Sequence, residues 1–207
     1  MKKIKKVLIL GNSITRHGPL PEIGWPYNWG MAASSIENDF VHVLMGYIRE
    51  AFSDAETMFF NIAGFERDFP QTEYEGAEHA IEVAKQWRPD TIVLRIGENV
   101  DDEKAPENNF GKYYEGLIER LIEPSGARVF CVNSFWRKKY VNDIMKSVAD
   151  KMGLPYVDIT PLGDDPANKA IGLFEHKGVA DHPGDLGMKR IADAIWDAIK
   201  KDYNIKR

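Results

Sequence analysis

Residues 7–15 carry the sequence Val-Leu-Ile-Leu-Gly-Asn-Ser-Ile-Thr, and this stretch sets the fold. Its first four residues are apolar on both faces of an extended chain, which is typical of a buried strand in a parallel sheet. Gly11 and Asn12 accept tight backbone angles, so the chain can turn directly after the strand. Ser13 then lies at the carboxyl end of that strand, the edge where open α/β sheets bind ligands. Two roles suit Ser13 there: a nucleophile, or a cap for a following helix.

Short apolar runs alternate with amphipathic stretches along the rest of the chain. The runs predict strands over residues 57–62, 91–96, 128–132 and 155–159. Helical spacing predicts helices from Ser34 or Ser35 to residue 52 and over residues 74–87, 113–121, 141–152 and 186–203. Because parallel strands need crossover connections, this alternation predicts a five-stranded parallel sheet between helices, a three-layer α/β/α sandwich. The length of 207 residues suits a single domain over residues 1–207.

Composition excludes several classes of function. The formal net charge of -5 argues against nucleic acid as the main partner, because a phosphate-binding surface needs excess Lys and Arg. No stretch approaches the roughly 18 apolar residues of a membrane span.

The basic residues 1–6 precede a short apolar run without a cleavage site. The chain as written is therefore expected to be cytoplasmic, or secreted or periplasmic if a signal peptide was removed. The single cysteine, Cys131, reads as a buried thiol.

Polar clusters follow the predicted strands and would gather at one edge of the sheet. They are residues 11–13, 61–64 and 97–99, with a fourth cluster, residues 180–183, before the last helix. Acyl transfer needs a nucleophile, a base and donors for the developing oxyanion. Ser13 can be the nucleophile, and His182 can be the base because imidazole titrates near neutral pH. Asn99 offers a side-chain amide and Gly64 an unobstructed N–H.

These clusters carry a resemblance. Gly-Asn-Ser-Ile-Thr after an N-terminal strand resembles the first block, usually Gly-Asp-Ser, of the SGNH (GDSL-like) hydrolases. Gly97-Glu98-Asn99 resembles the Gly-x-Asn-Asp block of that family. His182-Pro183 before a helix resembles its last block, Asp-x-x-His-Pro. The order of the blocks and their distances fit over essentially the whole chain.

The resemblance implies a flavodoxin-like three-layer fold and hydrolysis of ester or acetyl groups. Carried over position by position, it makes Ser13 the nucleophile and His182 the general base and then acid. The backbone N–H groups of Ser13 and Gly64 and the side chain of Asn99 would form the oxyanion hole. No cofactor is implied. The histidines show no pair at ligand spacing, so no metal site is expected either.

Three departures concern the first, second and third blocks. Asn12 stands where the family has Asp, a mild change because that residue is outside the catalytic triad. Val100 follows Asn99 in place of the family's Asp. The glycine of the second block is open, since Gly64 lies only three residues beyond Asn61 and Glu66 can occupy the usual site. Acidic residues near these blocks (Glu66, Asp68 and Glu98) are expected to be solvated at the surface.

The largest departure is the acid of the last block, whose position is taken by Val179. Asp181 directly precedes His182 instead, and adjacent side chains on an extended loop tend to point apart. Three partners for the imidazole therefore stay open: Asp181, a backbone carbonyl, or a more distant acid such as Glu175. A dyad can still function, because the third group mainly holds the tautomer and orientation.

Residues 16–31 are too rich in Pro and Gly for a regular element, and they carry Trp25, Tyr27 and Trp29 in alternation. These aromatic rings either bind a sugar or acyl group or cover the end of the core. Trp136, just after the fourth predicted strand, is a further candidate for a wall of the site.

The leading hypothesis is a serine esterase that acts through an acyl-enzyme on small acyl esters, above all acetyl groups on carbohydrates. One alternative is a catalytically inactive carbohydrate-binding relative. Another is an acylhydrolase of the lipase or thioesterase type. A nucleotide or phosphate binder ranks last, because the Gly-Asn-Ser-Ile-Thr turn lacks both the Gly-x-Gly-x-x-Gly and the Gly-Lys-Ser/Thr patterns. The sequence does not indicate an oligomeric state.

Overall fold

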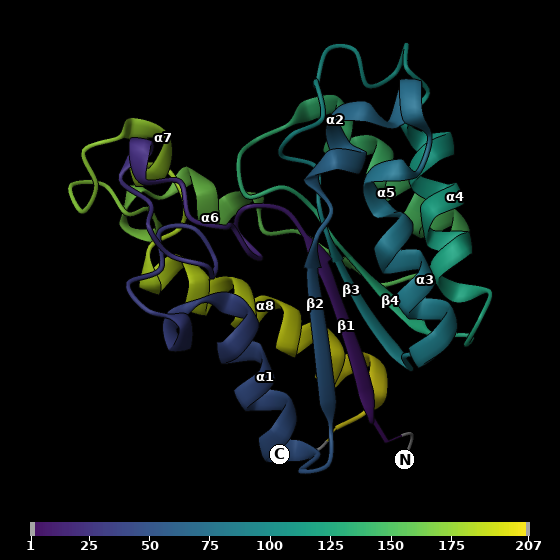
Figure 1. The fold of residues 1–207 in the computed structure, drawn as a ribbon. Coiled ribbons are helices and arrows are strands. Elements are labelled where there is room, and N and C mark those ends of the chain that lie inside the picture. Colours follow the sequence, from purple (N-terminus) through teal and green to yellow (C-terminus); the bar gives the residue numbers. More distant parts are fainter. Residues whose placement is uncertain (1–2, 206–207) are drawn as a thin grey trace.

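A computed structural model describes residues 3–205 and contains the predicted five-stranded parallel sheet (Figure 1). Its strands are β1 (Lys6–Gly11), β2 (Glu56–Asn61), β3 (Thr91–Arg95), β4 (Arg128–Val132) and β5 (Tyr156–Val157). All neighbours are parallel, in the order β2-β1-β3-β4-β5. The apolar start of the 7–15 stretch is thus the inner strand β1, between β2 and β3. This position explains why both of its faces are apolar.

Helices cover both faces of the sheet and complete the predicted three layers (Figure 1). The described helices are α1 (Phe40–Ala51), α2 (Ala63–Thr72), α3 (Glu78–Trp87), α4 (Phe110–Ile122), α5 (Lys139–Met152), α6 (Thr160–Asp164), α7 (Lys177–Ala180) and α8 (Asp185–Tyr203). α1 and α8 pack on one face, and α2 to α5 pack on the other. No helix within residues 3–205 combines the length and the apolar character that crossing a membrane requires.

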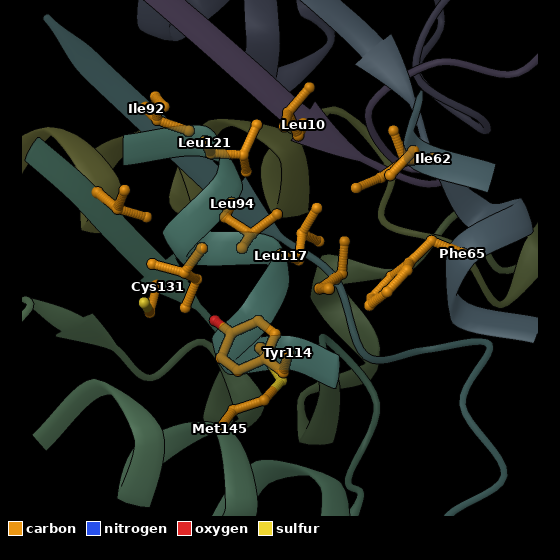
Figure 2. Packing of buried hydrophobic residues seen from close by; sticks show 14 of the residues in the cluster. Leu10, Ile62, Phe65, Ile92, Leu94, Tyr114, Leu117, Leu121, Cys131 and Met145 are labelled. Carbon is orange, nitrogen blue, oxygen red and sulfur yellow. The ribbon is translucent and has the colours of Figure 1, made fainter. Parts of the chain in front are cut away.

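Two apolar cores lie on the two faces because successive residues of a strand point to opposite sides. In β1, Leu8 and Leu10 face α2 to α5, whereas Val7 and Ile9 face α1 and α8. Figure 2 shows the first core, with side chains of the sheet lying against Leu117 of α4. Cys131 is fully buried in this core, as its apolar surroundings predict.

The structure differs from the sequence-based expectation at the start of α1, in the length of β5 and in the short helices. α1 begins at Phe40 and not at Ser34 or Ser35, because the Asp39 side chain caps it by accepting a hydrogen bond of 2.8 Å from the His42 N–H. β5 covers two residues of the predicted strand 155–159.

α2 follows β2 directly, although residues 61–67 show no helical periodicity and Pro70 lies inside the helix. Its start is fixed locally, because the Asn61 side chain accepts a hydrogen bond of 2.8 Å from the Ala63 N–H. α6 and α7 lie within residues 160–180, where the spacing of apolar residues predicts no helix. Both are too short for an apolar face to be visible as periodicity.

Candidate active site

Ser13 lies on a tight turn at the carboxyl end of β1. The Asn12 carbonyl accepts hydrogen bonds from the N–H groups of Thr15 (2.9 Å) and Arg16 (3.0 Å), which close the turn. A side chain at Gly11 could not fit, because its Cβ would lie 1.9 Å from Thr15 Oγ1. Residues 14–20 contain no helix, so the helix-cap alternative for Ser13 is wrong.

The Ser13 hydroxyl meets the imidazole of His182. Ser13 Oγ lies 2.9 Å from His182 Nε2, although 169 positions separate the two residues. The other ring nitrogen, Nδ1, lies 2.7 Å from the Gly178 carbonyl oxygen. A carbonyl can only accept, so Nδ1 carries the proton of the neutral ring. Nε2 is then the free base and accepts the hydrogen bond from Ser13.

Asp181 does not orient His182, which corrects one of the three alternatives. Its carboxylate is 45% exposed and pairs with Lys169 Nζ at 2.8 Å. The physical reason is that Asp181 has helical backbone angles at the end of α7 and its carboxylate is held by Lys169. Glu175 is exposed and makes no hydrogen bond to His182 within residues 3–205. The Gly178 carbonyl is the partner.

Val179, which takes the position where the resemblance to the SGNH hydrolases implies an acid, lies in an apolar cluster. Val179 is fully buried with Trp25, Met31, Ala32 and Ala170. A carboxylate among these groups would lose its hydration without gaining a partner, which is costly. Trp25 is 0% exposed, so it cannot be a substrate wall and packs beneath the His182 loop instead. Figure 1 shows the segment after β1 lying beside α7, as this packing requires.

Burial sets the charge state of the imidazole. It lowers the pKa of His182 to about 4, and the hydrogen bond to the Gly178 carbonyl opposes this shift only in part. Burial acts in this direction because it disfavours the charged ring. His182 is therefore neutral at pH 7 and available as a base.

The three donors expected for an oxyanion hole are the N–H groups of Ser13 and Gly64 and the side-chain amide of Asn99. Gly64 is the second residue of α2, and the first N–H groups of a helix lack intrahelical partners. Within residues 3–205, neither the Ser13 N–H nor the Gly64 N–H has a hydrogen-bond acceptor. Asn99 is exposed and donates one hydrogen of Nδ2 to Glu66 Oε2 at 2.8 Å. Its second hydrogen is left for another acceptor.

Glu66 and Glu98 lie below this edge of the sheet, contrary to the expectation that they are solvated. Glu66 is 1% exposed and the Glu98 side chain is 3% exposed, whereas Asp68 is exposed as expected. Burial, and then the negative charge of Glu98, raises the pKa of Glu66. Hydrogen bonds from Asn99, the Gly97 N–H and Asn12 act against that rise.

The Arg95 guanidinium neutralises part of this buried charge. It donates to Glu98 Oε1 at 2.5 Å and to the Asn12 side-chain carbonyl. The Asn12 amide in turn donates to Glu98 Oε2 at 2.6 Å and to Glu66 Oε1 at 3.2 Å. An Asp at position 12 would put a third carboxylate against these two, so the change from the family's Asp is not mild.

Comparisons with known proteins bear on the fold. Neither a protein-family model nor a curated protein sequence matches the chain. Among solved structures, a two-domain esterase active on acetylated mannans superposes with a TM-score of 0.62 at 18% identity, covering 95% of this chain. The chain spans about half (49%) of that protein. A protein described as a GDSL-like lipase from Bacteroides ovatus superposes with a TM-score of 0.61 at 13% identity, covering 97% of this chain and 100% of the other.

The chain has the SGNH hydrolase fold. A salicylyl-acyltransferase from a tetracycline biosynthetic pathway shares it, with a TM-score of 0.62 at 14% identity, covering 97% of this chain and 55% of the other. At identities of 13–18% these superpositions establish the architecture that the sequence blocks predict.

In this SGNH fold the aromatic segment 16–31 lies next to Ser13. The Met31 N–H donates to the Ser13 carbonyl at 2.9 Å, which ties the segment to the turn. Tyr27 is 40% exposed and stacks on Trp29 at 4.4 Å between ring centroids. Of the three aromatic residues of this segment that were proposed as substrate contacts, Tyr27 and Trp29 present surface, whereas Trp25 is buried.

Trp136 packs against His182. Its ring meets the His182 ring edge-on at 4.9 Å between centroids, and its Nε1 donates to the Asp181 carbonyl at 3.2 Å. The residue is partly buried and thus holds the His182 loop while keeping some surface at the site.

Sequence reasoning missed the buried polar layer formed by Glu66, Glu98, Arg95 and Asn12. One signal was present: Arg95 interrupts the apolar run of residues 91–96, and Glu98 follows it at a distance of three residues. A charged residue in a central strand needs a buried partner.

Proposed function

We propose that this protein is a serine esterase that removes small acyl groups, acetyl above all, from carbohydrates. The observation that carries the proposal is the contact of 2.9 Å between Ser13 Oγ and His182 Nε2, with Nδ1 held by the Gly178 carbonyl. The base faces the nucleophile in the tautomer that accepts a proton. This constellation is a dyad, and a main-chain carbonyl takes the orienting role of an acid.

In the first half-reaction, Ser13 Oγ attacks the ester carbonyl carbon while its proton passes to His182 Nε2. The tetrahedral intermediate collapses, the bond to the alcohol oxygen breaks, and His182 returns the proton to the leaving alcohol. In the second half-reaction, water attacks the acyl-enzyme as His182 again takes a proton. Collapse of that intermediate releases the acid and restores the Ser13 hydroxyl.

We assign the oxyanion hole to the N–H groups of Ser13 and Gly64 and the Nδ2 of Asn99. Ser13 follows β1, Gly64 begins the helix after β2, and Asn99 follows β3. Because β1 lies between β2 and β3, the two other donors flank the nucleophile from opposite sides. The N-terminus of α2 also favours negative charge. Removing one such donor costs about 10²–10³-fold in kcat in serine hydrolases.

Carbohydrate esters are the preferred substrate class because of the Tyr27–Trp29 pair. Its stacked rings offer a flat aromatic face on a segment bonded to the nucleophile turn. Flat aromatic faces suit sugar rings. A protein with the same fold is an esterase active on acetylated mannans, which supports this choice.

Hydrolysis assays test the proposal. We expect the purified protein to release acetate from p-nitrophenyl acetate and from acetylated mannooligosaccharides. Ser13→Ala and His182→Ala should each lower kcat on the order of 10⁴-fold or more, because nucleophile and base act as a unit. Faster cleavage of long-chain esters or thioesters would favour the lipase or thioesterase alternative. Sugar binding by the folded protein without any turnover would favour the carbohydrate-binding alternative.

Asp181→Asn is the matched control for the dyad. Asp181 is adjacent to His182 but bonds to Lys169, so kcat should stay within about twofold of the wild type. A loss of 10³-fold or more, as for a removed orienting acid, would contradict the assignment of that role to the Gly178 carbonyl. All three variants can be compared in the same acetate-release assay.

A further inference from the structure

One buried carboxylate contacts the loops that carry the oxyanion donors. Glu66 Oε1 accepts hydrogen bonds from the Gly97 N–H (2.6 Å), the Asn99 N–H (3.3 Å) and Asn12 Nδ2 (3.2 Å). Glu66 Oε2 accepts from Asn99 Nδ2 at 2.8 Å. In each of these contacts an N–H group donates to the carboxylate, so the ionised side chain can accept all four hydrogen bonds.

The contacts of Glu66 converge on the proposed oxyanion hole. Asn99 is itself a donor, Asn12 directly precedes Ser13, and Gly64 lies two residues before Glu66 on the same helix. We propose that Glu66 is the positioning residue of the oxyanion hole, aiming the Asn99 amide by holding one of its two hydrogens and fixing the loop that carries it. This inference rests on the proposed esterase function and deepens it.

This arrangement makes the Asn99 side chain rigid. An oxyanion donor contributes only if it is already aimed at the place where the charge develops. Asn99 is exposed, and an exposed amide without a partner rotates freely. Two hydrogen bonds to a side chain that is 1% exposed, one from its N–H and one from its Nδ2, remove that freedom.

Glu66→Gln is the sharp variant because it keeps the shape of the side chain and replaces one acceptor by a donor. The new NH₂ group would face donors of Asn99, Gly97 or Asn12. We expect kcat for p-nitrophenyl acetate to fall about 10²-fold, the effect of one lost oxyanion donor, with KM within about threefold. Asp68→Asn removes the same charge from an exposed position of α2 and should leave both constants unchanged.

A double-mutant cycle separates positioning from general damage to the fold. If Glu66 acts through Asn99, the Glu66→Gln/Asn99→Ala variant should lose no more than about threefold beyond Asn99→Ala alone. Fully additive losses, or an unchanged kcat in Glu66→Gln, would overturn the proposal. Thermal melts establish that each variant is folded at the temperature where its kcat is measured.

The same variants distinguish failure of this inference from failure of the proposed function. If the wild type hydrolyses no ester, the proposed function fails. Positioning is then measured by NMR on the Asn99 side-chain NH₂ resonances. Glu66→Gln should shift these resonances and speed their hydrogen exchange, and Asp68→Asn should not. Unchanged Asn99 resonances in Glu66→Gln would refute the positioning role.

Discussion

The proposed dyad of Ser13 and His182 depends on a neutral imidazole whose proton is on Nδ1. The Gly178 carbonyl fixes the tautomer, since it can only accept from Nδ1 at 2.7 Å. A carbonyl carries no full negative charge, so it stabilises the imidazolium less than a carboxylate does. Burial lowers the pKa of His182, and the hydrogen bond to the Gly178 carbonyl opposes this shift only in part. At the residue scale, the imidazole of His182 therefore stays neutral at a lower pH than an ordinary histidine does.

The pH dependence of kcat/KM follows from this pKa. Because the pKa of His182 is lowered from 6.5 to about 4, the active neutral form persists as the pH falls through 6 and 5. The acid limb of kcat/KM, which reports the free enzyme, should therefore lie near pH 4. Initial rates with p-nitrophenyl acetate in buffers of constant ionic strength measure it. An acid limb near pH 6.5 would contradict the lowered pKa.

The pH dependence of thermal stability is the control for the pH profile of kcat/KM. A lowered pKa in the folded state means that the unfolded chain binds the His182 proton more readily. The contribution of His182 to the free energy of unfolding is then fully present above about pH 6.5, and it is lost as the pH falls toward 4. Thermal melts at each pH identify the range in which the protein is folded, and kcat/KM is compared only there.

At the scale of elements, α2 connects the sheet edge to the buried carboxylate layer. It begins two residues after β2 and carries both Gly64 and Glu66 within its first turn. A 3₁₀ turn at Glu75–Ala77 packs against this start. Gly76 makes the close approach possible, because a Cβ there would lie 2.0 Å from the Phe65 N atom.

Gly76→Ala tests this packing. The added methyl group must displace the start of α2, which moves the Gly64 N–H and Glu66 together. We expect a lower Tm and a fall in kcat of about tenfold or more, since small misplacements of a donor are costly. Gly46→Ala in α1 is the matched control, because no atom lies within 4 Å of its added Cβ. A folded Gly76→Ala protein with unchanged kcat would show that α2 does not position the site.

At the scale of the whole molecule, the sequence predicts the architecture well and the polar layer poorly. Strands could be located because both faces of each central strand are buried, which leaves unbroken apolar runs such as residues 7–10. The order of the elements also predicts the sheet topology, which brings the loops after the strands to one edge of the sheet. His182 and Ser13 could be paired only because the clusters that contain them resemble the last and first blocks of the SGNH hydrolases.

Contacts between side chains of distant loops cannot be predicted from the order of the elements. Asp181 is adjacent to His182 in sequence yet bonds to Lys169, and Glu66 looks like a surface residue until α2 buries it. Trp25 likewise has the appearance of a binding residue and is packed against Val179. In each case the outcome depends on packing between elements, and no local pattern encodes it.

Covalent labelling of Ser13 tests the catalytic dyad most directly. The folded wild-type protein is incubated with an alkyl fluorophosphonate, which reacts only with an activated serine, and the adduct is mapped by peptide mass spectrometry. The dyad predicts one adduct per chain, on Ser13, and at least about 10²-fold slower labelling of His182→Ala, while Asp181→Asn labels at the wild-type rate. Absence of an adduct on the folded wild type, or an adduct on another residue, would contradict it.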